Sequence, residues 1–425
     1  MTDLRTEEFD VVRGATPEEL ERLAAEANAD HDDPLSGEML EVNMGPQHPA
    51  THGVLRLKAI LDGETIHGME PVVGYLHRGK EKSAESLGWR KFFVHTDRLD
   101  YVQPLANNIG YAMALEKLGK VEIPQRAQEL RVLILELNRI MAHLIYIGTT
   151  GIDLGAVSIF FFSFKQREWI YNLLDSWSGH RMHHAYVRVG GLYADIEEKH
   201  EREITEFIDQ FPKALDDIES LLSRNRIWFD RNKDVGTITR EQAIDWSLTG
   251  PNLRASGVDY DLRKAQPYCG YETYDFEVPT GSVGDCYDRY LCRMAEMRES
   301  AKLVKQALER IKASRGQEFL AEDRHYVLPP KERVHTSMEE LIYQFKIVTD
   351  MTLPKGEAYT AIESSKGELG FHIVSDGTPK PKRCYIRVPS LLNVQVIPLA
   401  AQGHLLSDMM AVIGSLDFVM GEVDK

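Results

Sequence analysis

Two long segments of the chain repeat apolar residues at helical spacing. In residues 126–148 the apolar positions return every three or four residues, which places them on one face of a helix. Residues 288–312 show the same rhythm, which is typical of helices that pack against one another. These positions are Leu130, Ile134, Leu137, Met141 and Leu144 in the first segment, and Tyr290, Met294, Met297, Ala301, Val304, Leu308 and Ile311 in the second. We therefore predict a helical bundle over residues 82–320.

Shorter segments on either side of this bundle have the pattern of β-strands. Near the N-terminus, "MLEVNM", "GVLRLKAIL" and "ETIHGMEPVVGYL" alternate or run apolar, with "DGE" at 62–64 as a hairpin turn. Near the C-terminus, a predicted helix, "SMEELIYQFKIVTD", precedes the strand-like "GEAYTAIES", "GELGFHIVSDG" and "KRCYIRVPS", and "DMMAVIGSLDFVMGEVDK" ends the chain as a helix with an ordered tail. The predicted fold class is α+β: a central helical bundle flanked by a small N-terminal antiparallel β-sheet and a C-terminal mixed α/β region.

Residues 1–37, which precede the first strand-like segment, are predicted to form an acidic arm. Within "ATPEELERLAAEA", Thr16 can serve as an N-cap, Pro17 as the first helical residue and Glu19 as the end of a capping box, which predicts a short helix. "ADHDDPLSGE" then ends that helix. The expected organisation is an arm at 1–37, a small β domain with a histidine loop at 38–81, a helical core at 82–320 and a mixed region at 321–425.

Composition narrows the class of protein. Hydrophobic residues make up 43% of 425 residues, which is enough to build a large packed core. A formal charge of −16 disfavours a non-specific nucleic-acid binder and leaves acidic surface for basic partners. The apolar stretch at 155–164 is too short to span a bilayer, and the N-terminus lacks the plan of a signal peptide. We expect a soluble protein that is cytoplasmic or matrix-like and binds no nucleic acid.

The cysteines and the common enzyme signatures narrow the chemistry further. Cys269, Cys286, Cys292 and Cys384 form no CxxC pair, so we expect buried reduced thiols and no zinc or iron–sulfur site held by this chain alone. The sequence has no P-loop, no GxGxxG after a strand, no HExxH and no GxSxG. Nucleotide-dependent and hydrolytic chemistry are therefore poorly supported.

A stiff loop near the N-terminus carries two histidines. In "GPQHPATHGVLRL", His48 and His52 are four residues apart, but Pro46 and Pro49 forbid the regular helix that would present both on one face. The glycines and prolines instead predict a tight loop that holds an imidazole in a fixed position. Two interpretations remain from the residues alone: a functional histidine, or a structural one that hydrogen-bonds the turn.

Two further segments place polar side chains beside apolar helices. "HTDRLDYVQPLANNIGYAMALEKLG" puts Arg98, Asp100 and Tyr101 just before an amphipathic run, where a tyrosine is usually a packing residue with a solvated hydroxyl. "GTTGIDLGAVSIFFFSFKQREWI" puts Asp153 in a glycine-punctuated break between two apolar helices. An unpaired buried carboxylate is costly, so Asp153 is either the N-cap of the following helix or the partner of a distant His or Arg.

Two other patterns favour structural roles or an interface. Glu136, Arg139 and His143 share a second face of the helix at 126–148, and their spacing favours a charged ladder that packs against a neighbour over a metal site. Residues 253–285 are aromatic and rich in turns without a clear period, and loops of that length are usually functional or interface-forming.

Together, these segments closely resemble the D-type, quinone-site subunit of respiratory complex I, the proton-pumping NADH:quinone oxidoreductase. The resemblance runs from about residue 38 to the C-terminus and rests on "NMGPQHPATHGVLRL", "GYLHRGKEK", "DRLDYV", "GIDLGA", "RMHHAYVRVGG", "LTGPNLRASGVDYDLRK", "GYETYDFEVPTG", "ESSKGELGFHIVSDG" and "SLDFVMGEVDK". One departure is Phe418, where the family commonly has proline.

That family is similar to the large subunit of nickel–iron hydrogenases, so the resemblance implies a hydrogenase-large-subunit-like fold. Hydrogenases bind their metal centre through an early and a late CxxC pair. This chain has "RLDYVQ" and "SLDFVMGEV" in those places, without a cysteine in either. Its residues therefore cannot hold that nickel site.

The resemblance implies a quinone pocket in the space related to the lost metal site. By family role, His52 and Tyr101 hydrogen-bond the quinone head group, and Asp153 pairs with His52. Quinone reduction puts negative charge on carbonyl oxygens and consumes two protons, for which imidazolium and phenol are suitable donors. A carboxylate behind the histidine favours its charged form. His48 keeps the structural interpretation.

Five further positions follow from the same resemblance. Arg78, Arg98 and His183 match family positions near a terminal iron–sulfur cluster held by a neighbouring subunit. Positive or hydrogen-bonding groups there raise the affinity of the cluster for an electron. Asp417 and Val419 match positions that line the quinone or inhibitor region.

The resemblance also implies what surrounds the chain. No cofactor is bound by this chain: quinone is the substrate, the iron–sulfur cluster belongs to the neighbour, and NADH is used by the whole complex. The expected partners are that iron–sulfur subunit, a C-type protein of the peripheral arm, a membrane subunit at the quinone entrance and other complex I subunits. The expected location is the cytoplasmic face of the bacterial inner membrane, peripherally bound, and the chain alone is expected to be inactive. Two alternatives stay open: a hydrogenase-like scaffold in a related membrane redox complex with another electron donor, and an assembly protein with a vestigial pocket.

Overall fold

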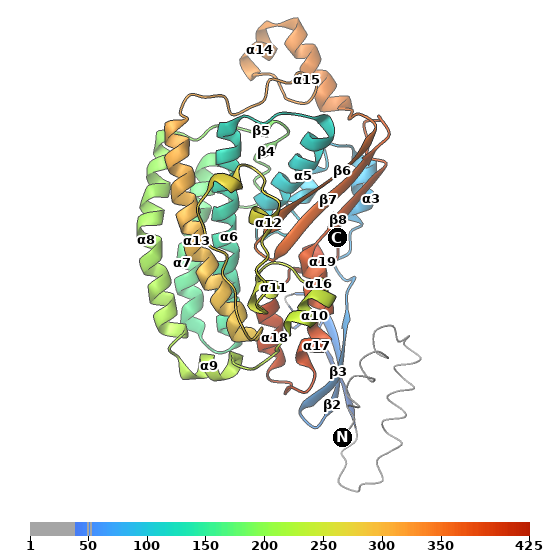
Figure 1. The fold of residues 1–425 in the computed structure, drawn as a ribbon. Helices are drawn as coiled ribbons and strands as arrows, with labels where there is room; N and C mark the ends of the chain where they lie inside the picture. Colours follow the sequence, from blue (N-terminus) through green and yellow to red (C-terminus); the bar gives the residue numbers. More distant parts are fainter. Residues whose placement is uncertain (1–38, 49–50, 52) are drawn as a thin grey trace.

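Four long helices stand side by side and form the body of the molecule (Figure 1). The computed structural model describes residues 39–48, 51 and 53–425. The acidic arm predicted for residues 1–37, with its capping residues, and His52 lie outside the described residues. The long helices are α6 (Gln125–Asp153), α7 (Val157–Ser178), α8 (Glu198–Leu222) and α13 (Cys286–Ala313).

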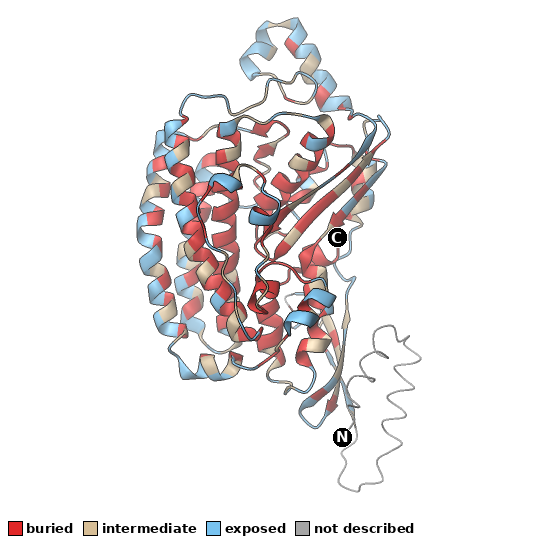
Figure 2. Cartoon of the chain, viewed as in Figure 1, coloured by how far each residue is buried: buried red, intermediate tan, exposed pale blue. Residues whose placement is uncertain are grey.

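Helix α6 lies at the centre of this bundle, and most of its residues are buried. It packs against α7 and α13, and the apolar stripes predicted for 126–148 and 288–312 are both buried (Figure 2). These two helices are thus confirmed. Helix α8 packs against α7 and α13 through one apolar face and leaves its charged face exposed. One feature within 82–320 was not predicted: β4 (Val187–Arg188) and β5 (Gly191–Leu192) form a short ribbon between α7 and α8.

The junction between α6 and α7 corrects one expectation from the sequence. The break predicted between the two helices is present but shorter than expected: it covers residues 154–156, and α6 continues through Gly148 and Gly151 and includes Asp153 as its last residue. A Cβ at Gly148 would lie 2.6 Å from Ser163 Oγ, so this glycine lets α7 approach closely and does not end the helix. The N-cap of α7 is Ala156, without a side-chain cap. The N-cap role considered for Asp153 is therefore wrong.

The N-terminal sheet is antiparallel, and its predicted hairpin is confirmed. Its strands, in spatial order, are β1 (Leu40–Met44), β2 (Arg56–Asp62) and β3 (Thr65–Val72). The turn between β2 and β3 covers residues 63–64, as "DGE" predicted. Alternate residues of β2, namely Leu57, Ala59 and Leu61, are buried in an apolar cluster with the helices near the C-terminus.

The C-terminal sheet contains the three predicted strands in an antiparallel order. They are β6 (Gly356–Ser364), β7 (Gly367–Ser375) and β8 (Arg383–Arg387). Helix α5 (Pro104–Gly119) packs on β6 and β7. Ser364 pairs with Gly367, so Ser365 and Lys366 alone form the turn of the β6–β7 hairpin. Both turn residues are fully buried, which is unusual for a hairpin tip.

The other helices are short, and the longest of them, α15, lies with α14 outside the body of the molecule. Residues 253–285, expected to be a long loop, contain the end of α11, all of α12 and a 3-10 helix, η2. Helices α14 and α15 extend away from the bundle and leave most of their surface exposed (Figures 1 and 2). The helical bounds are α3 (Lys80–Leu87), α4 (Phe93–Thr96), α9 (Arg226–Asn232), α10 (Arg240–Asp245), α11 (Pro251–Ala255), α12 (Leu262–Ala265), η2 (Tyr271–Thr273), α14 (Lys331–Thr336), α15 (Met338–Asp350), α16 (Pro389–Gln395), α17 (Ile397–Ala401), α18 (Met409–Leu416) and α19 (Met420–Val423).

Two properties of the described residues bear on membrane and metal binding. Among them, no helix is long and apolar enough to cross a bilayer. The same part of the chain has no group of three or more His, Cys, Asp or Glu side chains that could hold a metal ion.

The four cysteines are free thiols, of which three are buried as predicted and Cys269 is half-buried. Burial raises the pKa of the Cys292 and Cys384 thiols to about 12.

Candidate functional site

Two segments far apart in the sequence meet at Tyr101. Tyr101 lies in an irregular turn before α5, and Val419 lies between α18 and α19. Val102, Ala142 and Val419 form a small buried apolar cluster, and Tyr101 packs against it. A Cβ on Gly421 would lie 2.9 Å from Cε1 of Tyr101, so glycine is required for the late segment to pass this closely. The structure thus brings together two of the predicted site residues.

A buried ammonium group lies close to Tyr101. The Nζ atom of Lys366 is 3.3 Å from Oδ2 of Asp100 and 3.8 Å from Oδ2 of Asp417. Asp417 Oδ2 is also 3.9 Å from Nε of Arg293. Burial acts to lower the pKa of Lys366, but Asp100, Asp417 and Glu422 together raise the pKa above its usual value. Lys366 is therefore charged at neutral pH.

Three groups around this ammonium have displaced pKa values. Burial raises the pKa of Tyr101, and Asp100 raises it further, whereas Lys366 lowers it. Burial and Asp100 raise the pKa of Glu422 to about 8, against the opposing effects of Lys366 and Lys80. Burial lowers the pKa of Lys80 to about 8, although Glu422 opposes this shift. An acid and a base that both titrate near pH 8 can take up or release protons under physiological conditions.

Arg78, Arg98 and His183 lie around a shared neighbour, Lys80. Arg78 and Arg98 are exposed and His183 is half-buried. Besides burial, both arginines contribute to the lowered pKa of Lys80, and Arg98 and Lys80 contribute to the lowered pKa of His183. Lys80 Nζ also donates hydrogen bonds to the carbonyl oxygens of Arg98 and Gly421, the latter at 2.9 Å. Lys80 therefore connects this positive patch to the segment that passes Tyr101.

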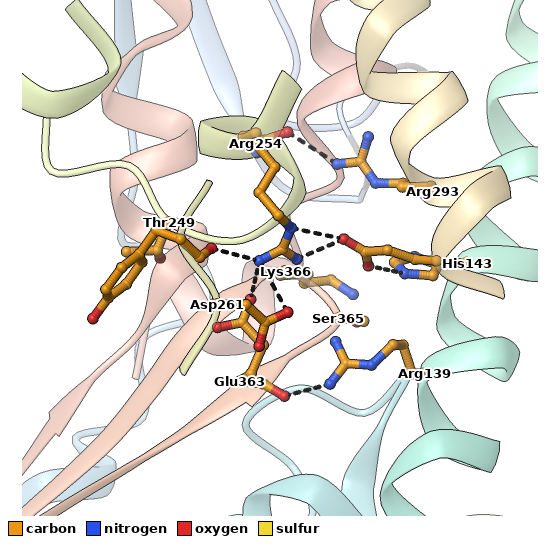
Figure 3. A network of polar contacts seen from close by, with 12 residues as sticks. Arg139, His143, Thr249, Arg254, Asp261, Arg293, Glu363, Ser365 and Lys366 are labelled. Carbon is orange, nitrogen blue, oxygen red and sulfur yellow. Dashed lines mark hydrogen bonds and ion pairs between the residues drawn. The ribbon is translucent and has the colours of Figure 1, made fainter. Parts of the chain in front are cut away.

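Behind the site lies a fully buried network of charged side chains (Figure 3). Arg254 donates to both Glu296 and Glu363, with N–O distances of 2.5 and 2.8 Å. His143 Nε2 is 2.9 Å from the second oxygen of Glu296. Arg139 donates to the carbonyl oxygen of Glu363 at 2.7 Å. These contacts tie α6 and α13 to β6, the strand that leads into the turn holding Lys366.

The charged ladder predicted on α6 is confirmed by this network. Glu136 pairs with Arg139 at 3.3 Å and with Arg263 at 3.1 Å, and Arg263 pairs with Asp261 at 2.6 Å. Asp261 and Arg263 belong to residues 253–285, the segment without apolar period. Buried ion pairs therefore anchor that segment, which explains why its sequence shows no helical or strand repeat.

Asp153 is the last residue of α6, ten residues beyond His143 of this network. It is half-buried, and the helix rises about 16 Å over the eleven residues from Ala142 to Asp153. Large apolar side chains are exposed around it, namely Ile152, Val157, Phe161 and Phe162. Asp153 is thus placed at an exposed apolar edge of the molecule.

The histidine loop is only partly described. His48 is exposed, and its carbonyl oxygen accepts hydrogen bonds from the backbone N and the Oγ1 of Thr51, at 3.1 and 2.8 Å. The backbone of His48 therefore closes the turn. His52 lies outside the described residues, so its contacts with Asp153 and with quinone stay predictions.

Sequence reasoning assigned no role to Lys366, Glu422 or Lys80. All three lie inside motifs that carried the resemblance, "ESSKGELGFHIVSDG", "SLDFVMGEVDK" and "GYLHRGKEK". Lysine in a hairpin turn normally reaches solvent, so no local signal marks Lys366 as buried. A surface cavity of about 410 Å³ lies elsewhere, between residues 121–124 and 318–323, and none of its lining residues belongs to the site.

Comparisons with known proteins place the chain in a family. A family model described as respiratory-chain NADH dehydrogenase, 49 Kd subunit, matches residues 153–425. The NADH-quinone oxidoreductase D-type subunit of Methylacidiphilum infernorum is 52% identical over 390 residues, which cover 92% of this chain and 93% of that protein. The chain belongs to the 49 Kd subunit family.

Other members of the 49 Kd subunit family match over nearly their full length. A D-type subunit of NADH-quinone oxidoreductase from Herpetosiphon aurantiacus is 48% identical over 405 residues, which cover 95% of this chain and 96% of that protein. The corresponding protein of Geobacter sulfurreducens is 48% identical over 391 residues, with 92% of this chain and all of that protein covered. The family model begins at Asp153, whereas these relatives extend the similarity into the part of the chain that carries Arg78, Arg98 and Tyr101.

Proposed function

We propose that this chain forms the quinone-reduction site of an NADH:quinone oxidoreductase, as one of its peripheral subunits. The observation that carries this proposal is the meeting of Tyr101 with Val419 and Gly421 beside buried Lys366 and Glu422. The names of the similar proteins, which are D-type subunits of NADH-quinone oxidoreductases, support the reaction class. Full-length similarity to subunits of that name also supports a role within a larger enzyme.

The proposed chemistry uses proton donors on this chain and electrons from outside it. Reduction of a quinone to a quinol takes up two electrons and two protons. Tyr101 donates a hydrogen bond to one carbonyl oxygen, and His52, paired with Asp153, donates to the other. Negative charge that develops on the quinone oxygens is stabilised by these donors, and protons given up near Tyr101 are replaced from groups such as Glu422 and Lys80.

Electrons are proposed to arrive on the patch that carries Arg78, Arg98 and His183. Large apolar side chains are exposed within a few residues of each, namely Tyr75, Leu76, Val94 and Met182. Exposed apolar residues around a positive patch are typical of a protein interface. We assign this face to an iron–sulfur subunit that holds the terminal cluster, and the apolar edge around Asp153 to a membrane subunit at the quinone entrance.

Other partners and the location follow from the same proposal. A C-type protein and further complex I subunits complete the peripheral arm, on the cytoplasmic face of the bacterial inner membrane. The hydrogenase-like architecture is supported by the convergence of "RLDYVQ" and "SLDFVMGEV" on one site, although neither carries a cysteine. An affinity pull-down of the membrane-bound complex identifies the electron-donating module. An NADH-oxidising module supports this proposal, and a ferredoxin- or formate-linked module in its place would favour the scaffold alternative.

Variants of Tyr101 and His52 test the catalytic assignment. In membranes that contain the assembled enzyme, Tyr101→Phe and His52→Ala are expected to lower long-tail quinone reduction on the order of 10²- to 10⁴-fold, the range for loss of a proton donor. The amounts of all subunits and NADH oxidation with a soluble artificial acceptor should stay unchanged. Tyr193→Phe, which removes an exposed phenol elsewhere, is the matched control. Wild-type quinone reduction in both site variants would refute the assignment.

A further inference from the structure

The segment of residues 73–79 has no helix or strand and little burial of its own, and within it one turn is closed by the backbone N of His77, which donates to the carbonyl oxygen of Gly74 at 3.1 Å. It joins β3 to α3 and carries Arg78. The side chains of Val73, Tyr75, Leu76, His77 and Arg78 are all exposed. Apolar burial therefore contributes little to its shape. A defined conformation must come from hydrogen bonds to its backbone.

Besides the bond within the turn, Asp424 accepts two further backbone hydrogen bonds of the loop from the other end of the chain. Its Oδ1 atom accepts from the backbone N of Gly74 at 2.8 Å, and its Oδ2 atom accepts from the backbone N of Leu76 at 2.7 Å. The carbonyl oxygen of Asp424 is 3.0 Å from Nδ1 of His77. Asp424 itself is 4% exposed. Both oxygens of a buried carboxylate are thus used on one exposed loop, and hydrogen bonds to a charged acceptor are the stronger kind.

The residues just before Asp424 are held against the other parts of the site. Gly421 packs on the ring of Tyr101, and its carbonyl oxygen accepts from Lys80 at 2.9 Å. Residues 421–424 therefore connect the tyrosine of the site to the loop that carries Arg78. By contrast, Lys425 contacts a different element, since it pairs with Glu81 on α3 at 3.1 Å.

We propose that Asp424 is a positioning residue for electron entry, because its carboxylate holds loop 73–79, and with it Arg78, in the shape that the neighbouring iron–sulfur protein binds. This inference rests on the proposed function, since it takes the Arg78 patch as the face of electron entry. Asp424 touches neither quinone nor cluster and acts through the loop.

The two acceptor atoms make the conservative variants informative. Asparagine has one acceptor oxygen, and its amide nitrogen would face a backbone N–H group, so Asp424→Asn loses at least one of the two loop contacts. Asp424→Glu keeps both carboxylate oxygens on a longer side chain and should retain part of the hydrogen bonding to the loop. Lys425→Met is the matched control, because it removes a charged contact of the adjacent residue and leaves the loop contacts in place.

The experiment compares these variants in the membrane-bound, fully assembled enzyme. The amounts of all subunits, kcat and KM for a long-tail quinone, and the electron paramagnetic resonance spectrum of the terminal cluster are measured. We expect Asp424→Asn to lower kcat on the order of 10- to 100-fold, the range for loss of a supporting contact at a redox or metal site. KM should change little, the cluster spectrum should change, and Asp424→Glu should lie between Asp424→Asn and wild type. Lys425→Met should behave like wild type.

The inference is overturned if Asp424→Asn has the kcat and cluster spectrum of Lys425→Met, or if glutamate recovers nothing relative to asparagine. If Asp424→Asn does not assemble, Asp424→Glu is compared with Lys425→Met at equal amounts of assembled enzyme. A lower kcat in the glutamate variant then supports the inference, and an equal kcat overturns it. Failure of the proposed function shows separately, as wild-type quinone reduction in Tyr101→Phe.

Discussion

Replacement of Lys366 by methionine tests the electrostatic core of the site. The substitution keeps most of the side-chain volume and removes the ammonium that lies 3.3 Å from Asp100 and 3.8 Å from Asp417. At an effective dielectric constant of about 20, these two attractions amount to about 5 and 4 kcal/mol. Desolvation of the ammonium offsets part of this gain, so the net loss is expected to be about 3–5 kcal/mol, as for other buried pairs left with one partner.

The same substitution should also change catalysis, through Tyr101. Lys366 lowers the pKa of Tyr101, whereas burial and Asp100 raise it. Without the ammonium the phenol becomes a weaker acid, and a weaker acid is a poorer proton donor to the quinone. Quinone reduction should therefore fall even at temperatures at which the variant is fully assembled.

The assay is thermal inactivation of quinone reduction in membranes, together with the rate at a temperature well below inactivation. Lys366→Arg is the control, because it keeps a positive charge in the turn. We expect Lys366→Met to inactivate at a clearly lower temperature and to reduce quinone more slowly per assembled enzyme, with Lys366→Arg closer to wild type. Equal stability and equal rate in Lys366→Met would refute the electrostatic reasoning.

Two further predictions concern Glu422 and metal content. The pKa of Glu422 is raised from its ordinary value of 4.5 to about 8 in the folded chain, so the stability that its proton contributes is fully present below about pH 4.5 and is lost as pH rises through 8. Glu422→Gln should therefore gain thermal stability relative to wild type as pH rises from 5 to 9, by at most about 5 kcal/mol, and a pH-independent difference would contradict this. Elemental analysis of the purified chain should find no nickel or iron, and a stoichiometric amount of either would overturn the argument from the cysteines.

Local sequence patterns predicted the main helices and strands because the burial of apolar side chains imposes these patterns on the sequence. The repeats in α6 and α13 follow from the need to bury one or more helix faces, and the strands of both sheets follow from alternation and turn residues. The short ribbon of β4 and β5 was missed because two-residue strands carry no period. Residues 253–285 were expected to be a loop because their sequence has no apolar period. The structure shows that ion pairs of Arg254 and Arg263 hold this segment in place, and ion pairs leave no periodic pattern in the sequence.

The candidate site was harder to predict because it is assembled from distant segments. Tyr101 and Val419 are more than 300 residues apart in sequence, and only the family resemblance suggested that they share a site. No role was predicted for Lys366 because the residues of a hairpin turn are usually exposed to solvent. In this protein the turn that carries Lys366 is buried inside the molecule. The role of Asp153 as partner of His52 rests on the resemblance and stays a prediction.

The most direct test of the central claim separates electron arrival from quinone reduction in time. The assembled enzyme is mixed with NADH in the presence of quinone, frozen at successive times, and the redox state of the terminal iron–sulfur cluster is read by electron paramagnetic resonance. In Tyr101→Phe we expect the cluster to be reduced as fast as in wild type but to be reoxidised by quinone far more slowly. Reoxidation at the wild-type rate in that variant would contradict a quinone-reduction site at Tyr101.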